Sequence, residues 1–153
     1  FNILQERNPN INLHVKEITT GEIINQLEKA EIDMALLATP LNNPNLLEIP
    51  IYYERFFAYV SPTEPLYNII KEYEMHHLPT DHLWILKEGH CLRNQVMRLC
   101  ESESGFSTIY EAGSIDTLIK IVDTNGGYTI IPELHVNLLT EQQKLNVRPI
   151  VNP

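Results

Sequence analysis

Short apolar runs alternate with segments that have helical spacing of apolar residues along almost the whole of this 153-residue chain. Apolar residues occupy every second position from Ile11 to Val15, which predicts a half-buried strand over residues 11–18. Residues 19–30 then carry apolar side chains at helical spacing, behind a pair of threonines that can cap a helix. Residues 32–38 are apolar apart from one aspartate, as in a strand buried on both faces. A strand, a helix and a strand in this order form a parallel crossover, so the pattern predicts an α/β fold with mostly parallel sheets.

The same alternation continues to the end of the chain and predicts two lobes. Further strands are expected at residues 46–53, 56–60, 83–86, 107–111, 128–131 and 146–153, and helices at residues 1–7, 67–73, 92–100, 114–122 and 132–139. The pattern is interrupted near Glu54, so we expect residues 1–54 to form lobe I and residues 55–153 to form lobe II. The chain opens inside an expected helix, without an initiator Met, and closes inside an expected strand, so we also expect a domain truncated at both ends.

Composition and charge argue against several classes of function. Hydrophobic residues make up 43% and charged residues 20% of the chain, values that are normal for a soluble globular protein. The formal net charge is −9 and no run of Lys and Arg could follow a phosphate backbone, so these residues are not expected to bind DNA directly. No apolar stretch approaches the roughly 20 residues that span a bilayer, and no secretory signal opens the chain. We therefore expect a soluble, cytoplasmic protein without membrane contact.

The chain has two cysteines, Cys91 and Cys100. A cytosolic chain of this size does not need a structural disulfide, so the two thiols are either inert core residues or reactive groups. The histidines that could join them in a zinc site are scattered at His76, His77, His82 and His90. A structural zinc ion needs four ligands at characteristic spacings, which this set does not provide, so we expect no metal.

Cys91 has the surroundings of a nucleophile, and Cys100 does not. Cys91 is expected at the start of a helix, where free backbone N–H groups favour a thiolate, with His90 before it and Arg93 just after it. Cys100 is at the other end of the same segment, beside acidic residues that do not favour a thiolate. The pattern therefore suggests one attacking and one resolving thiol.

A helix over residues 91–100 would keep these two thiols apart. Nine helical steps of about 1.5 Å separate their Cα atoms by roughly 13 Å, and nine rotations of about 100° place them on opposite faces. A disulfide needs Cα atoms within about 7 Å, so the pair can be joined only if the segment between them refolds. That requirement is typical of a redox switch, in which a sulfenic acid condenses with a second thiol.

The segment around the cysteines resembles a known family. Residues 88–100 read Glu-Gly-His-Cys-Leu-Arg-Asn-Gln-Val-Met-Arg-Leu-Cys and closely resemble the redox segment of the hydrogen-peroxide sensors among the LysR-type transcriptional regulators, cysteine spacing included. Residues 27–37 and 126–132 resemble patterns that LysR-type regulators share in general. The resemblance covers most of the chain and implies a two-lobed, periplasmic-binding-protein-like regulatory domain. Two positions depart from the family pattern, with Asn94 in place of a common acidic residue and Arg98 in place of a small one.

The resemblance also implies a site and its partners. It makes Cys91 the thiol that hydrogen peroxide oxidises and Cys100 its disulfide partner. His90 and Arg93 would shape the pocket of the thiol, and Thr20 would present a hydroxyl across the cleft. The resemblance further implies a regulator, not an enzyme, that needs no cofactor, forms a homodimer or homotetramer, binds promoter DNA through a helix-turn-helix domain absent from this chain, and contacts RNA polymerase. From the residues alone, Thr20 could equally be a plain helix cap. His90 could instead be a core residue, and Arg93 a solvated helix charge or a salt-bridge partner.

Two other functions stay open at this point. An ordinary LysR-type sensor would bind a small organic effector between its lobes, with both cysteines incidental. A thiol peroxidase or disulfide oxidoreductase would turn over repeatedly, but the chain has no Cys-x-x-Cys motif. A step that refolds the protein also suits signalling better than turnover.

Overall fold

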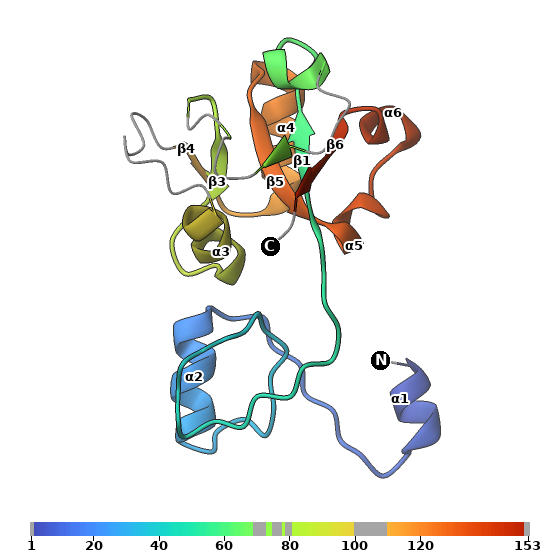
Figure 1. Ribbon diagram of the computed structural model, residues 1–153. Helices are drawn as coiled ribbons and strands as arrows, with labels where there is room; N and C mark the ends of the chain where they lie inside the picture. The colour runs from blue at the N-terminus through green and yellow to red at the C-terminus, as the bar shows by residue number, and fades with distance from the viewer. Residues whose placement is uncertain (1, 69–72, 75–77, 79–80, 100–109, 152–153) are drawn as a thin grey trace.

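The computed structural model describes residues 2–68, 73–74, 78, 81–99 and 110–151. In chain order the elements are α1 (Asn2–Arg7), α2 (Thr20–Glu28), β1 (Phe56–Val60), a 3-10 helix η1 (Pro65–Asn68), β2 (Tyr73–Glu74), β3 (Trp84–Leu86), α3 (Cys91–Leu99), β4 (Tyr110–Ala112), α4 (Ile115–Asn125), β5 (Tyr128–Pro132), α5 (Glu133–Val136), α6 (Glu141–Lys144) and β6 (Val147–Val151). Figure 1 shows these strands gathered in one part of the molecule, with α1 and α2 in the other part and an extended stretch of chain leading up to β1.

A four-stranded sheet in the order β2-β6-β1-β5 forms the centre of the strand-containing part (Figure 1). β1 pairs antiparallel with both of its neighbours, so that Phe57 lies opposite Ile131 on one side and Pro149 on the other. β2 and β6 pair in parallel, and β3 and β4 form a separate parallel pair. An isolated parallel bridge between Leu83 and Tyr128 links the two sheets.

The expectation of mostly parallel sheets holds only in part, because β1 runs against both of its neighbours. β5 and β6 run in the same direction and are connected through α5 and α6, as a crossover unit requires. β1 lies between them, which makes this a split crossover. The strand-helix-strand rule predicts that β5 and β6 are parallel, but it does not predict the strand inserted between them. The α/β class itself is confirmed.

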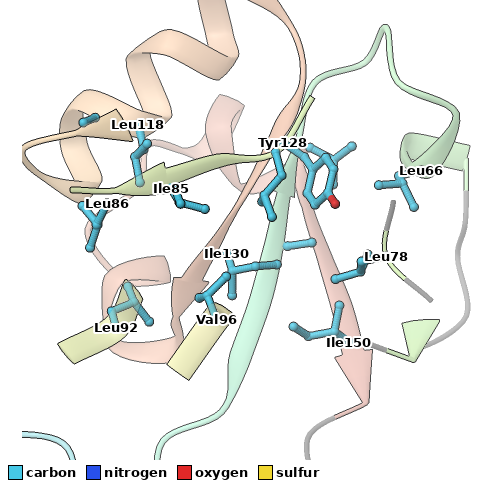
Figure 2. Packing of buried hydrophobic residues seen from close by; sticks show 14 residues of the cluster. Leu66, Leu78, Ile85, Leu86, Leu92, Val96, Leu118, Tyr128, Ile130 and Ile150 are labelled. Atoms are coloured by element: carbon cyan, nitrogen blue, oxygen red, sulfur yellow. The ribbon is translucent and has the colours of Figure 1, made fainter. Parts of the chain in front are cut away.

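Two buried clusters hold the helices against the strands. In the larger cluster, Leu92 and Val96 of α3 pack with residues such as Ile85 of β3 and Ile130 of β5 (Figure 2). The second cluster contains Tyr59, Ile119, Val122, Ile131 and Leu139. Burying a Leu or Val side chain contributes roughly 1.5–3 kcal/mol, so Leu92 and Val96 are the apolar anchors that position α3.

The strands expected before residue 54 do not form. The prediction of strands at residues 11–18, 32–38 and 46–53 is wrong, because these segments have no strand pairing among the described residues. Many of their apolar side chains are exposed: Ile11, Val15, Met34, Leu36, Leu47, Ile49 and Ile51. Alternation shows which side chains share a face, but a strand also needs a partner for its backbone N–H and C=O groups. The described residues do not supply that partner.

Most elements after residue 54 agree with the sequence pattern, although their bounds differ. The helix expected at residues 67–73 is only partly right, since η1 ends at Asn68 and Tyr73 lies in β2. Residues 69–72 lie outside the described residues, as do residues 107–109 of the expected strand at residues 107–111, which overlaps β4. Helix α5 is shorter than predicted, because the chain turns after it.

Candidate thiol site at the start of helix α3

Cys91 is the first residue of α3. Strand β3 ends at Leu86, and residues 87–90 lead from it into the helix. Within them, Gly89 has a φ of 97°, in a region that residues with a side chain rarely adopt. The Cys91 thiol is free and half-buried, and the first turn of α3 contains no acidic residue. The predicted position of Cys91 at a helix start is therefore confirmed.

Thr19 caps the start of α2. Its side-chain oxygen accepts a hydrogen bond from the backbone N–H of Glu22, and the Glu22 carboxylate accepts one from the Thr19 hydroxyl at 2.8 Å and one from the Thr19 N–H at 3.1 Å. The bond from the hydroxyl, followed by that from the N–H, holds the pKa of Glu22 below its ordinary value. Thr20 is the first helical residue, so the interpretation of Thr20 as the cap is wrong. Within the described part of the chain, the Thr20 hydroxyl makes no hydrogen bond.

The turn before α3 lies against the start of α2. The backbone N–H of Thr20 donates a hydrogen bond of 3.4 Å to the carbonyl oxygen of Gly89. A Cβ atom on Gly89 would lie 3.3 Å from Cγ2 of Thr19, so the two segments meet with little space for another side chain. The structure thus brings together two turns that are far apart in the sequence, and it places Thr20 beside the turn that carries His90 and leads into Cys91.

The Arg93 guanidinium joins α3 to both strands of the small sheet. Its Nη1 atom donates a hydrogen bond of 2.9 Å to the carbonyl oxygen of Leu86 and forms an ion pair with Glu111 of β4. The Arg93 side chain is only 14% exposed. The interpretation of Arg93 as a salt-bridge partner is therefore confirmed, and Glu111 compensates its positive charge.

The sequence pattern gave no indication of Glu111. Its position follows from the parallel register of β3 and β4, which pairs it with Ile85. One sequence signal could have identified Glu111. The first turn of the helix contains an arginine, and the strand that follows the helix contains an acidic residue. Such a signal is weak, because the register that brings the two charges together is tertiary information.

His90 lies in the turn that precedes α3. His90 is half-buried, and its carbonyl oxygen accepts a hydrogen bond of 3.1 Å from the backbone N–H of Arg93. Its imidazole has no hydrogen bond or ion pair with the residues that the structure describes. Cys100 lies outside the described residues. The described residues also contain no group of three or more His, Cys, Asp and Glu side chains that could hold a metal ion.

A small pocket lies between α3 and the strands beneath it. Its walls are Trp84, Ile85, Leu86, Leu92, Arg93, Val96, Leu118, Thr129 and Ile130. Most of these side chains are apolar, and Leu92, Arg93 and Val96 are the lining residues that come from α3.

Comparison with known proteins agrees with this arrangement. The LysR substrate binding domain matches residues 2–153. The hydrogen peroxide-inducible genes activator of Haemophilus influenzae is 32% identical over 129 residues, which are 84% of this chain and 42% of that protein. The HTH-type transcriptional regulator EstR of Acinetobacter baylyi is 29% identical over 147 residues, 94% of this chain and 48% of that protein. The crystal structure of OxyR from Porphyromonas gingivalis is similar with a TM-score of 0.83 and 34% identity, over 97% of this chain and 68% of that chain.

These matches define the family of the chain. It spans about half the length of the curated relatives it matches. Among the described residues, no helix has the length and apolar character that crossing a bilayer would require. The relatives include a regulator named for peroxide and one with a different name, so membership of the family does not by itself specify the signal. Since the family match extends over residues 2–153, the chain belongs to the LysR substrate binding domain family.

Proposed function

We propose that this chain is the redox-sensing domain of a LysR-type transcriptional regulator that detects hydrogen peroxide. Cys91 is the thiol that peroxide oxidises, and Cys100 is the thiol that closes a disulfide with it. The observation that carries the proposal is the position of Cys91, a free and half-buried thiol on the first residue of α3, beside a turn that contacts α2. Similarity to a hydrogen peroxide-inducible genes activator and to OxyR supports the same function.

The oxidation proceeds in two steps. The Cys91 thiolate attacks one oxygen atom of H2O2 and breaks the O–O bond, which gives a sulfenic acid and a hydroxide ion that takes up a proton to become water. The Cys100 thiol then attacks the Cys91 sulfur, and the sulfenic oxygen leaves as a second water molecule. The two thiols lose two electrons and one peroxide molecule gains them, so no cofactor takes part.

The length of α3 supports a conformational change in the second step. Its nine residues run from Cys91 to Leu99. At about 1.5 Å per residue, the Cα atoms of these two residues lie roughly 12 Å apart. Cys100 is joined to Leu99 by one peptide bond, which sets their Cα atoms about 3.8 Å apart. While α3 is intact, the Cα atoms of the two cysteines therefore stay at least about 8 Å apart, and a disulfide needs about 7 Å or less. Oxidation thus requires α3 to lose part of its helical structure.

Three further residues complete the proposed site. The hydroxyl of Thr20 is not used to cap α2, and Thr20 contacts the turn that contains His90. We assign Thr20 and His90 to peroxide binding and to stabilising the thiolate and the departing hydroxide. Arg93 lies in the first turn of α3 and is paired with Glu111, so we assign it the indirect role of holding that turn.

The remaining assignments concern the whole protein, and the family match supports them. Residues 1–54 form lobe I and residues 55–153 form lobe II, while a helix-turn-helix domain outside this chain binds promoter DNA in the cytoplasm. The protein acts as a homodimer or homotetramer, and the change at α3 alters how the subunits present their DNA-binding domains to the promoter and to RNA polymerase. Each oxidation changes the conformation of α3, which suits signalling better than repeated turnover, so in this proposal the chain acts as a regulator and not as an enzyme.

Disulfide mapping tests the proposed function. The reduced chain is treated with an equimolar amount of H2O2, the remaining thiols are blocked, and unreduced peptides are analysed by mass spectrometry. We expect a disulfide between Cys91 and Cys100. The Cys91→Ser variant should form no disulfide, whereas the Cys100→Ser variant should stop at a sulfenic acid on Cys91. If the unmodified chain forms no such disulfide, the proposed function is wrong.

A small organic effector is the second candidate signal, and the similarity to a regulator that is not named for peroxide favours it. Screening of small organic acids by thermal unfolding distinguishes the two candidates. A shift in melting temperature that persists in Cys91→Ser would support the organic effector, whereas peroxide sensing predicts that the response depends on Cys91.

A further inference from the structure

The ion pair between Arg93 and Glu111 fixes the beginning of α3 to a separate part of the sheet. Nη1 of Arg93 contacts both the Glu111 carboxylate and the carbonyl oxygen of Leu86. Glu111 is held in β4 by its parallel register with Ile85 of β3. The position of Glu111 therefore depends on the pairing of β3 with β4 and not on α3. The ion pair connects the helix to this strand pair.

The surroundings of this ion pair make it stronger than an ordinary surface pair. The side chain of Arg93 is 14% exposed and that of Glu111 is 42% exposed. In the pair between Arg55 and Glu133, the corresponding values are 65% and 39%. Water and salt screen a partly buried guanidinium less than an exposed one, so the Arg93 pair contributes more to the stability of its segment.

Helix α3 is held both by apolar packing and by this ion pair. Leu92 and Val96 are the buried apolar side chains of α3 in the larger cluster, and both also line the small pocket beneath the helix. Met97 of α3 is partly buried and packs against the same cluster. The ion pair from Arg93 to Glu111 adds a polar contact to this apolar packing, and it acts two residues after Cys91.

Arg93 lies inside the segment that must refold, whereas Glu111 does not. If the disulfide closes as proposed above, α3 loses part of its helical structure, and we expect this change to move Arg93 relative to β4. We propose that Glu111 is a positioning residue for the thiol switch: by pairing with Arg93 it stabilises the reduced form of the α3 segment and thereby sets how readily Cys91 and Cys100 form their disulfide. This inference rests on the proposed function, because it concerns the same disulfide.

The direction of the effect follows from which form contains the ion pair. Reduction of the disulfide by two glutathione molecules gives two protein thiols and one glutathione disulfide, with transfer of two electrons. An interaction present only in the dithiol form favours that product, so it raises the reduction potential of the protein pair. Loss of the interaction should shift the equilibrium toward the disulfide.

The Glu111→Gln variant tests the inference, since glutamine has almost the same shape but no charge. The full chain is equilibrated in glutathione buffers of graded composition, and the disulfide fraction is measured by thiol blocking and mass spectrometry. We expect the equilibrium to shift roughly three- to tenfold toward the disulfide, which lowers the reduction potential by about 15–30 mV. The matched control is Glu133→Gln, which removes the more exposed ion pair with Arg55 and should leave the equilibrium unchanged.

A second variant separates positioning from a general loss of stability. The dithiol–disulfide equilibrium is also measured in Arg93→Gln and in the double variant with Glu111→Gln. The shift in the double variant should be smaller than the sum of the two single shifts, because either change alone removes the ion pair. A purely structural role would destabilise the dithiol and disulfide forms alike and leave their equilibrium constant. An unchanged or raised potential in Glu111→Gln would overturn the inference while leaving the proposed function intact. Absence of any disulfide in the unmodified chain would show that the proposed function has failed, and this inference with it.

Discussion

The backbone N–H of Thr20 donates a hydrogen bond of 3.4 Å to the carbonyl oxygen of Gly89 and so joins the start of α2 to the turn before α3. Thr20 is therefore held beside the turn that leads into Cys91, even though the two segments are far apart in the sequence. The geometry of the thiol site depends on the close contact between the start of α2 and the turn before α3. Substitutions at this contact test its importance.

The absence of a side chain at Gly89 permits this approach. Its φ of 97° is unfavourable for alanine, and a Cβ atom would lie 3.3 Å from Cγ2 of Thr19. We expect Gly89→Ala to lower the free energy of unfolding by roughly 1–3 kcal/mol, as measured by urea titration. The same variant should slow the reaction of Cys91 with peroxide, because the turn is displaced from α2.

Gly21→Ala is a matched control for this prediction. Gly21 lies in α2, and nothing would be within 4 Å of an added Cβ atom. Alanine favours a helix over glycine, so this variant should be more stable than the unmodified chain by roughly 0.5–1 kcal/mol. If both substitutions changed the free energy of unfolding equally, the close approach at Gly89 would not be the cause.

The two adjacent threonines should have different effects when replaced. Thr19→Ala removes the cap of α2 and should cost about 1 kcal/mol of unfolding free energy, whereas Thr19→Ser keeps the capping oxygen and should cost much less. Thr20→Ala should change stability little but should slow oxidation of Cys91, since we assign its hydroxyl to the peroxide site. Urea unfolding and stopped-flow thiol oxidation provide the two readings. Slower oxidation in Thr19→Ser with an unaffected Thr20→Ala would reverse these assignments.

The capping box also predicts a dependence of stability on pH. Hydrogen bonds from Thr19 hold the pKa of Glu22 below its ordinary value in the folded chain. A carboxyl with a lowered folded pKa stabilises the fold above its unfolded pKa of about 4.3, and this contribution is lost as the pH falls through the folded value. The stability difference between the unmodified chain and Glu22→Gln should thus be present at neutral pH and decrease in acid. Glu133, whose pKa is lowered by the hydrogen bond from Arg55, should follow the same direction.

Tyr59 connects the second buried cluster to a polar network. Its hydroxyl donates to Asp123, and the side-chain amide of Asn146 donates to the same oxygen at 3.3 Å. Burial, followed by the bond to Asp123, raises the pKa of Tyr59. We expect Tyr59→Phe to lower the free energy of unfolding by roughly 1–2 kcal/mol. Tyr67→Phe is the control, because it keeps the ring that lies 4.1 Å from the Arg148 guanidinium, and it should have little effect on the urea midpoint.

Local sequence features predicted the helix that begins at Cys91, but they did not predict which residues of other elements contact this helix. The helix expected at residues 92–100 begins in the structure at Cys91, so the start of α3 was predicted to within one residue. The pairing of Arg93 with Glu111 depends on the register of β3 and β4, which no local pattern encodes. Sequence alone could therefore identify the arginine but not the charge that neutralises it.

The strands expected before residue 54 were predicted from local pattern and do not form. Residues 11–18 alternate as a strand should, but Ile11 and Val15 are exposed and their backbone groups have no strand partner among the described residues. Alternation is a property of one segment, whereas a sheet is a property of two. In the same way, the insertion of β1 between β5 and β6 could not be predicted from either crossover strand.

Hydrogen exchange of α3 reports on the helix that must lose part of its structure when the disulfide forms. Peptides covering residues 91–99 are compared by mass spectrometry in the reduced chain and in chain whose mass shows the disulfide. We expect amides of α3 to be protected in the reduced chain and to exchange at least about tenfold faster after oxidation, while those of α4 are unchanged. Equal protection of α3 in both forms, with the disulfide present, would show that the disulfide closes without any change in the helix.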